Sequence, residues 1–185
     1  MQTLVRPLTD DDLDRLVELN RAAVPAVNDI DRDEMAWLVG QAELAVAVAV
    51  AAVPDEAPDA GEADAGPADA VLGFVLALRP GLDYASENYR WFSERGADFL
   101  YVDRIVVADG HRSAGLGAAL YSAVFDRARA LGADEVECEV NVEPPNPGSM
   151  AFHARLGFHE VGRQSTKGGA AVVALLVHPL EPSGE

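Results

Sequence analysis

A glycine-rich turn stands between a β-branched run and an amphipathic stretch near the middle of the chain. Residues 101–107 are typical of a buried strand, and a helical pattern of apolar residues begins at Leu116. Between them lies Arg112-Ser-Ala-Gly115-Leu-Gly117. A strand, a glycine turn and a helix start together aim backbone N–H groups and the positive end of the helix dipole at one point. The pattern therefore predicts a binding site for an anion, most often a phosphate.

Three kinds of phosphate loop compete for this stretch, and the spacing of the residues separates them. A Walker A loop needs Lys followed by Ser or Thr, where this chain has Leu116 and Gly117. A dinucleotide fingerprint needs a third glycine, where this chain has Leu120. The pattern that remains is Arg/Gln-x-x-Gly-x-Gly/Ala, which Arg112, Gly115 and Gly117 match. This stretch resembles the acyl-CoA loop of the GNAT acetyltransferases.

A second stretch, residues 146–158, strengthens the resemblance. GNAT proteins typically carry Asn-x-x-Ala-x-x-Leu/Phe-Tyr-x-x-Leu-Gly-Phe here, and this chain reads Asn-Pro-Gly-Ser-Met-Ala-Phe-His-Ala-Arg-Leu-Gly-Phe. Ser149 replaces the usual Ala, and His153 stands where the family most often has Tyr. The two motifs together resemble the GNAT core over residues 98–178. The run 139–149 is similar to a poorly characterised subgroup of acetyltransferases, which specifies no substrate.

The resemblance implies an α/β (α+β) protein with the GNAT acyl-CoA N-acyltransferase fold, a mixed central sheet with helices on both faces. It implies acetyl-CoA as the acyl-donor substrate, whose pantetheine arm would pair with the free edge of the strand that ends at Val107. Arg112 would add a charge beside the phosphates, unless it serves only to pair with Asp109. The expected cofactor-binding residues are Ile105, Val106, Val107, Arg112, Ser113, Ala114, Gly115, Leu116, Gly117, Asn146, Ser149 and Phe152.

Acetyl transfer to an amine also needs a base for the ammonium and an acid for the departing thiolate. Alternation along a strand places Asp103 on the same face as Tyr101 and Ile105, which makes Asp103 the first choice of base. Glu139 on the neighbouring strand is the second choice. Either carboxylate could instead neutralise an arginine. Because the family's Tyr is credited with protonating the thiolate, the resemblance assigns that role to His153, whose ordinary pKa of about 6.5 suits it.

Composition narrows the class of protein further. The chain has 185 residues, a hydrophobic content of 49% and a formal charge of −17, which fit one globular domain and exclude a general basic surface for nucleic acid. A high-salt source or a cationic substrate would each explain the acidity. The single Cys138, the absence of a signal-like start and the absence of an 18-residue apolar run predict a cytoplasmic protein without a membrane segment. No His/Cys cluster has metal-ligand spacing, so we expect no metal.

The remaining elements follow from local signals. Acidic capping patterns at Thr9 and Asp31 begin two helices, and residues 54–70 form a low-complexity acidic insertion, expected to be flexible, within a single domain of residues 1–185. Residues 84–96 carry four aromatics, which indicate either a partly helical lid over the acceptor pocket or packing against the second helix. The expected strands are 3–6, 44–53, 71–78, 101–107, 135–141, 158–164 and 171–177, with helices after Leu116 and Asn146.

Two functions remain open on this sequence. The first is an N-acetyltransferase that transfers the acetyl group of acetyl-CoA to a primary amine of an unidentified small molecule or protein. The second is a non-catalytic acyl-CoA-binding domain that acts as a sensor or regulator, which the missing Tyr favours. A homodimer is one expected oligomeric state.

Overall fold

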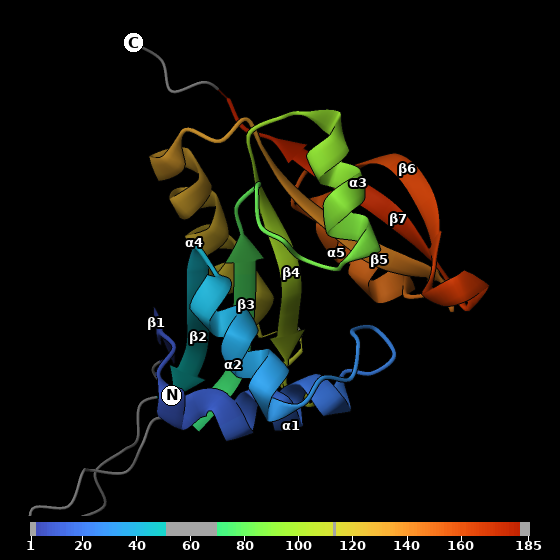
Figure 1. Cartoon of the computed structure of the whole chain (residues 1–185). Helices are drawn as coiled ribbons and strands as arrows, with labels where there is room; N and C mark the ends of the chain where they lie inside the picture. The colour runs from blue at the N-terminus through green and yellow to red at the C-terminus, as the bar shows by residue number, and fades with distance from the viewer. Residues whose placement is uncertain (1–2, 51–69, 113, 182–185) are drawn as a thin grey trace, which may run out of the picture.

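A mixed sheet of seven strands organises the residues that the structure describes, which are 3–50, 70–112 and 114–181 of this computed structural model (Figure 1). The strand order is β1-β2-β3-β4-β5-β7-β6, and β4 and β5 are the parallel pair. The acidic insertion expected at 54–70 lies outside the described residues except for Ala70. The strands are β1 (Thr3–Pro7), β2 (Leu44–Val50), β3 (Ala70–Leu78), β4 (Phe99–Val107), β5 (Glu135–Glu143), β6 (His159–Thr166) and β7 (Ala171–Pro179).

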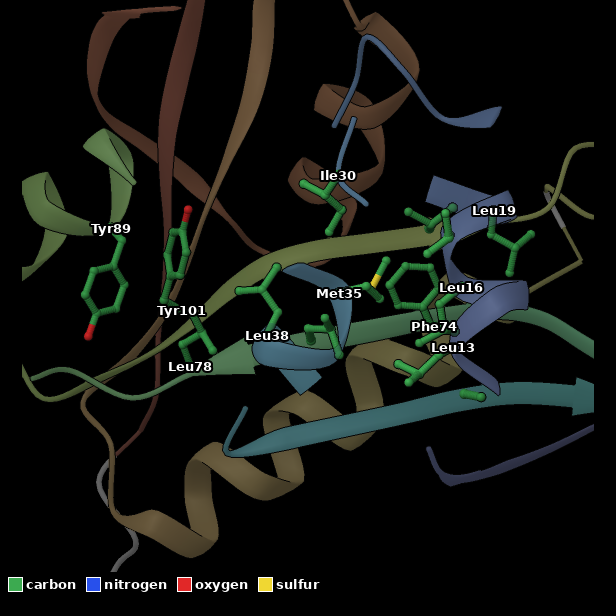
Figure 2. Close-up of a cluster of buried hydrophobic side chains, with 14 of the residues drawn as sticks. Leu13, Leu16, Leu19, Ile30, Met35, Leu38, Phe74, Leu78, Tyr89 and Tyr101 are labelled. Carbon is green, nitrogen blue, oxygen red and sulfur yellow. The ribbon is translucent and has the colours of Figure 1, made fainter. Parts of the chain in front are cut away.

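Helices cover both faces of this sheet, as predicted. On one face, Leu16 of α1, Met35 of α2 and Tyr89 of α3 share a core with the sheet residue Phe74 (Figure 2). On the other face, α4 packs Tyr121 against a second core that includes residues of β5 and β7. The helices are α1 (Leu13–Ala22), α2 (Arg32–Gln41), α3 (Glu87–Arg95), α4 (Leu116–Leu131) and α5 (Pro147–Arg155).

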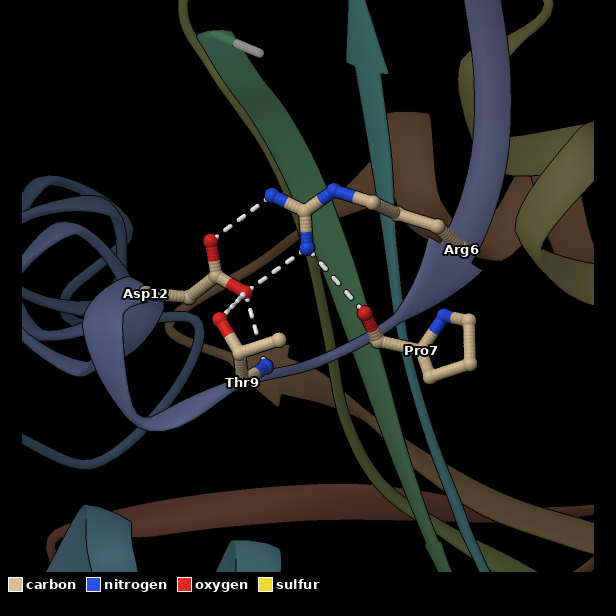
Figure 3. A network of polar contacts seen from close by, with 4 residues as sticks. All are labelled: Arg6, Pro7, Thr9 and Asp12. Atoms are coloured by element: carbon tan, nitrogen blue, oxygen red, sulfur yellow. Dashed lines mark hydrogen bonds and ion pairs between the residues drawn. The ribbon is translucent and has the colours of Figure 1, made fainter. Parts of the chain in front are cut away.

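The predicted caps hold the first two helices in place. The Asp12 carboxylate accepts the backbone N–H of Thr9 at 2.8 Å and both guanidinium N–H groups of Arg6, each at 2.8 Å (Figure 3). The hydrogen bond from Arg6 lowers the pKa of Asp12, despite its partial burial. Asp31 accepts the N–H of Glu34 at 2.9 Å and so caps α2. These contacts join the end of β1 to the helices beside the sheet.

A β-bulge at Asp103 changes the side-chain pattern of β4. Leu76 of β3 pairs with Arg104, but the next residue of β3 pairs with Val102, so Asp103 is the extra residue. The expectation that Tyr101, Asp103 and Ile105 share one face was wrong. Tyr101 packs in the core beneath α1, α2 and α3, whereas Ile105 packs against the core on the α4 side. Alternation fails because the extra residue shifts the two-residue period by one.

The strands β4 and β5 separate near the middle of the sheet. Their parallel pairing runs only from Phe99 opposite Glu135 to Tyr101 opposite Glu137. The free edge expected on the strand that ends at Val107 is therefore present beyond Tyr101. The strand β5 continues to Glu143, two residues past the expected end, because β7 pairs with it as far as Val172. The separation of β4 from β5 therefore starts close to the bulge in β4.

The aromatic segment 84–96 packs against the second helix, which is one of the two roles that the sequence left open, and part of it lines a cavity. Its helix α3 buries Tyr89 and Phe92, which are 2% and 0% exposed, in the core shared with α2. The residues just before and at the start of α3, among them Tyr84 and Asn88, line a large cavity. Tyr84 also stacks on Trp37 of α2, with ring centroids 5.7 Å apart. The segment is therefore a packed wall of the cavity.

Candidate active site

A cavity of 1190 Å³ occupies the space where β4 and β5 separate. It exceeds the roughly 300–1,000 Å³ of most small-ligand sites, which suits a long ligand and a second substrate. Its walls come from the α1–α2 connection, the start of α3, both strands, the first turns of α4 and α5, and the turn after β6. Of the residues expected at the site, those that line this cavity are Asp103, Ile105, Val106, Val107, Arg112, Gly115, Gly117, Glu139, Asn146, Ser149, Phe152 and His153.

The glycine turn presents a helix start to this cavity. Gly115 is the N-cap of α4 with φ of +80°, a conformation that only glycine adopts readily, and the helix begins at Leu116. The first N–H groups of α4 have no partner within the helix, so they can bind an anion together with the dipole. Ala114, by contrast, donates its N–H to the His111 carbonyl at 3.3 Å. Ser113 lies outside the described residues.

Arg112 and Gly117 each have a close neighbour within the protein. Arg112 is 65% exposed and pairs with Asp109 at 3.0 Å, the alternative that the sequence had left open. A Cβ on Gly117 would lie 3.1 Å from Cζ of Phe152. The Phe152 ring is therefore the first group that a side chain at Gly117 would meet. The glycine therefore allows α5 to pack closely on α4.

The side of the cavity nearest α1, α2 and α3 is acidic. The Tyr101 hydroxyl donates to Glu139 Oε2 at 2.8 Å. The Tyr84 hydroxyl donates to Asp103 Oδ1 at 2.6 Å, and Arg104 Nε donates to Asp103 Oδ2 at 2.7 Å. Burial, together with the charge of Asp103, raises the pKa of Glu139 to about 7. The same two causes raise the pKa of Tyr84, so its hydroxyl stays protonated.

These contacts leave the two candidate bases in different surroundings. Both oxygens of Asp103 already accept hydrogen bonds, one from the Tyr84 hydroxyl and one from Arg104, which is the kind of arginine pairing that the sequence left open. Bulge geometry explains the pairing, because Asp103 and Arg104 lie on the same side of the strand. Glu139 has a pKa close to neutral and lines the cavity, so it is the better placed of the two carboxyl groups to exchange a proton.

The α4 side of the cavity contains His153, which is 3% exposed. Its Nδ1 lies 2.8 Å from the Ser149 carbonyl oxygen and 3.3 Å from the Ser149 hydroxyl. Its Nε2 lies 2.7 Å from the hydroxyl of Tyr121. Burial lowers the pKa of His153, so the ring is neutral at pH 7. Its action on a thiolate stays a prediction, and both ring nitrogens already have partners.

Tyr121 is the site residue that the sequence did not indicate. It belongs to the apolar face of α4, where Leu120 and Val124 are also buried, so its pattern is that of a core residue. Only its polar tip distinguishes it, since a buried Tyr hydroxyl usually has a hydrogen-bond partner. Tyr84 and Tyr101 were likewise not expected to be hydrogen-bond donors, because aromatic residues in such patterns are usually read as core residues.

Two kinds of feature are absent from the described residues. In the ranges that the structure describes, no group of three or more His, Cys, Asp or Glu side chains could hold a metal ion. Within the same ranges, none of the helices combines the length and the apolar character needed to cross a membrane.

Comparisons with known proteins agree with this geometry. A family model described as the acetyltransferase (GNAT) family matches residues 25–158. The structure is similar to the ribosomal-protein-S18-alanine N-acetyltransferase from Escherichia coli, with a TM-score of 0.67, 16% identity, and coverage of 100% of this chain and 97% of that one. No curated protein matches the sequence significantly.

Two further solved structures are similar in the same way. The NAA60 of Arabidopsis thaliana, in complex with a bisubstrate analogue, has a TM-score of 0.69 and 22% identity, with coverage of 98% of this chain and 100% of that one. The yncA protein of Salmonella typhimurium, with its cofactor acetyl-CoA, has a TM-score of 0.65 and 18% identity, with coverage of 100% and 98%. At these identities the likeness shows the fold.

Proposed function

The chain belongs to the acetyltransferase (GNAT) family, and from that membership we propose that it transfers the acetyl group of acetyl-CoA to a primary amine of a small molecule or protein. The observation that carries the proposal is the position of the cavity between the separated β4 and β5. The start of α4 stands at one end of this opening and Glu139 lies within it. One ligand can therefore contact an anion site, an unpaired strand edge and a base at once.

The geometry supports a role for each part. The first N–H groups of α4 bind the pyrophosphate, and the edge of β4 that faces β5 pairs with the pantetheine amides beyond Tyr101. The amine enters from the side of α1, α2 and α3. Glu139 accepts a proton from its ammonium form, directly or through water, and the neutral amine attacks the thioester carbonyl. Asp103 then acts through its charge, which helps to hold the pKa of Glu139 near neutral.

The acceptor end of the cavity has features that suit a cationic amine. Glu34 of α2 and Glu87 of α3 line the cavity along with Glu139, and so does Lys167, the only Lys of the chain. The Lys167 backbone N–H donates to Glu87 at 3.2 Å, which ties the turn after β6 to α3. Opposite charges attract an ammonium group and raise its local concentration. The proposal therefore covers amines of small molecules and of proteins alike.

A non-catalytic acyl-CoA-binding domain is the second candidate. The observation that favours it is His153, which replaces the usual Tyr and uses both of its ring nitrogens in contacts within the protein. Such a domain would bind acetyl-CoA without turning it over.

We also propose one domain over residues 1–185, cytoplasmic, with a homodimer as one possible assembly. The support for one domain is that a single sheet takes its strands from residue 3 to residue 179. The insertion at 54–70 connects two adjacent strands of that sheet, β2 and β3.

Acetyl-CoA is expected to stabilise the protein against heat by about 3 kcal/mol at a hundredfold excess over its dissociation constant. The measurement is a thermal unfolding curve with and without ligand. ATP and NADH serve as controls and are expected to give no shift, because the loop lacks the residues that each would need. Equal shifts with ATP would contradict the assignment of the loop.

Release of free CoA then separates the two candidate functions. The protein is incubated with acetyl-CoA and a panel of amines: a peptide with a free N-terminus, an N-terminally blocked lysine peptide, and a polyamine. Thiol release together with a mass increase of one acetyl group on the amine supports acetyl transfer. Binding of acetyl-CoA without release, across the whole panel, supports the sensor.

Substituting Gly117 is expected to weaken acetyl-CoA binding more than substituting Arg112. In Gly117→Val the new side chain collides with Phe152, so the first turn of α4 and α5 must shift apart. In Arg112→Ala only an exposed, screened contact is lost, which is worth about 1 kcal/mol or less. Calorimetric titration of both variants with acetyl-CoA measures the two effects. Unchanged affinity in Gly117→Val would place the phosphates elsewhere.

A further inference from the structure

We propose that Asn88 positions the base Glu139, and that Gln164 orients the Asn88 amide so that its NH₂ group donates to the Glu139 carboxylate. The inference rests on the proposed acetyl transfer and adds two positioning residues to it. Its basis is the way in which the first turn of α3 is held beside the cavity. Asn88 lies in that turn and lines the cavity together with Glu139.

Contacts with β6 fix the position of α3, which lies beside β6 and β7 in Figure 1. Gln164 of β6 donates from Nε2 to Asn88 Oδ1 at 3.1 Å. Further along α3, the Trp91 ring covers Gly162 of β6 so closely that a Cβ on this glycine would lie 3.0 Å from it. The helix is therefore fastened to β6 at the turn that carries Asn88 and again about one turn beyond it.

The contact with Gln164 decides which way the Asn88 amide points. An amide group accepts through its oxygen and donates through its nitrogen. Because Oδ1 is the atom that meets Gln164 Nε2, the Nδ2 of Asn88 is left to donate to another group. Glu139 is that group, since a hydrogen bond with the Asn88 side chain lowers its pKa. A partner that lowers the pKa of a carboxyl group is one that donates to the charged form.

Glu139 needs this donor because its surroundings oppose the charged form. Burial raises its pKa most, and the negative charge of Asp103 adds to that effect. The Tyr101 hydroxyl, which donates to Glu139 Oε2 at 2.8 Å, acts in the opposite direction, as does Asn88. Two donors therefore hold the carboxyl group near pH 7, where it can both accept a proton and release it.

The other groups that face Glu139 do not produce a titration of this kind. Asp103 and Arg104 form an ion pair at 2.7 Å. Burial lowers the pKa of His153 below its ordinary value. Burial is the main cause that raises the pKa of four further groups, which therefore stay protonated near neutral pH: Tyr84, Tyr101, Tyr121 and Cys138. A titration near pH 7 that Glu139→Gln removes is therefore that of Glu139.

Asn88→Leu tests the inference, because it removes the donor without adding a charge. We expect the pKa of Glu139 to rise by about one unit or more, since a hydrogen bond to a charged group is lost. Asn88→Asp replaces the donor with a negative charge and is expected to raise that pKa further. The measurement is a carbon-13 NMR titration of protein labelled at its Glu carboxyl groups, with Glu139→Gln to identify the signal and no substrate present.

The rates are expected to follow the same shift, with the amine of the panel that the parent acetylates fastest. The ratio of variant to parent kcat/KM at each pH cancels the titration of the amine. For Asn88→Leu, kcat/KM is expected to be about fivefold below the parent at pH 7 and to approach the parent above about pH 9, where the base is ionised in both. A purely structural defect would lower the rate equally at every pH.

Gln164→Leu tests the orientation of the amide, because it removes the group that holds Oδ1. The Asn88 amide is then free to turn, so the pKa of Glu139 is expected to rise by part of the Asn88→Leu shift. Added to Asn88→Leu, it is expected to change nothing further, because Gln164 acts only through Asn88. Ser93→Ala is the control on the same helix: its hydroxyl donates to the Tyr89 carbonyl at 2.8 Å, and it is expected to leave the pKa unchanged.

Two outcomes overturn the inference. An unchanged pKa of Glu139 in both Asn88 variants would show that Asn88 does not donate to this carboxylate. A rise in Asn88→Leu that Gln164→Leu does not share would show that Gln164 does not orient the amide. If the parent releases no CoA with any amine, the proposed acetyl transfer fails, and the NMR titration still decides whether Asn88 and Gln164 hold Glu139 in this way.

Discussion

Replacing Glu139 with Gln is expected to lower turnover by about 10²-fold or more, the usual contribution of a general base. In the parent, burial and the charge of Asp103 raise the pKa of Glu139 to about 7. The carboxylate form that accepts a proton is populated above that value. The rate of the parent is therefore expected to rise with pH through about 7, and this limb is expected to be absent from Glu139→Gln. A pH–rate profile of both proteins measures the effect.

Two further variants test whether the effect is specific to Glu139. Asp103→Asn is expected to keep the limb but to move it to lower pH, because removal of a neighbouring negative charge lowers the pKa of Glu139. Glu137→Gln is the matched control on the same strand, since Glu137 lies outside the cavity and its variant is expected to keep the parent rate. A Glu139→Gln variant that keeps both the rate and the limb would assign the base to another group.

Replacing Glu137 with Gln is expected to stabilise the protein, by an amount that grows with pH. Glu137 is 0% exposed, and neither of its carboxyl oxygens has a hydrogen-bond partner among the described residues. One guanidinium, that of Arg95, lies 3.7 Å from Glu137 and 3.4 Å from Glu135, so two carboxyl groups share it. Burial, followed by the proximity of Glu135, raises the pKa of Glu137 to about 9.

The direction of the pH effect follows from proton linkage. Between the ordinary pKa of 4.5 and about 9, the folded protein keeps a proton on Glu137 that the unfolded chain releases. The parent therefore loses stability as pH rises, by roughly 1.4 kcal/mol per pH unit at most. Gln cannot titrate, so the gain of Glu137→Gln over the parent is expected to be larger at pH 8 than at pH 6. Thermal or denaturant unfolding at both pH values measures this difference.

A loss of stability at pH 8 would contradict this account. It would mean that Glu137 is ionised in the folded protein and that its attraction to Arg95 outweighs the cost of burial. Arg95→Met helps to interpret either result, because it removes the shared cation. In that variant the destabilising effect of rising pH is expected to be stronger.

Local signals in the sequence were sufficient for much of the fold. The glycine turn at Gly115, the caps at Asp12 and Asp31, and the apolar periods of α4 and the strands all depend on residues close together in the chain. Helix caps and turns need only short-range contacts, so they can be predicted without knowledge of the tertiary structure. The family motif added the expected fold and the expected position of the acyl-CoA loop.

No local pattern indicates the bulge at Asp103, and this one residue changes the surroundings of the first candidate base. Strict alternation had placed Asp103 with Ile105, whereas the extra residue pairs it with Arg104 and leaves Glu139 as the better candidate. A bulge depends on the register with the partner strand, which lies far away in the sequence. The sequence likewise does not indicate the close approach of Gly117 and Phe152, because Phe152 lies on another helix.

By itself, then, the sequence determined which elements form and where the helices begin, and it led us to expect an anion at the start of α4, because each of these depends on neighbours along the chain. Only the tertiary structure decided which polar groups meet. Tyr121 and His153 are 32 residues apart, and Tyr101 and Glu139 are 38 apart, yet each pair forms a hydrogen bond shorter than 3 Å. Such pairs arise from the packing of whole helices and strands on one another, which no local pattern specifies.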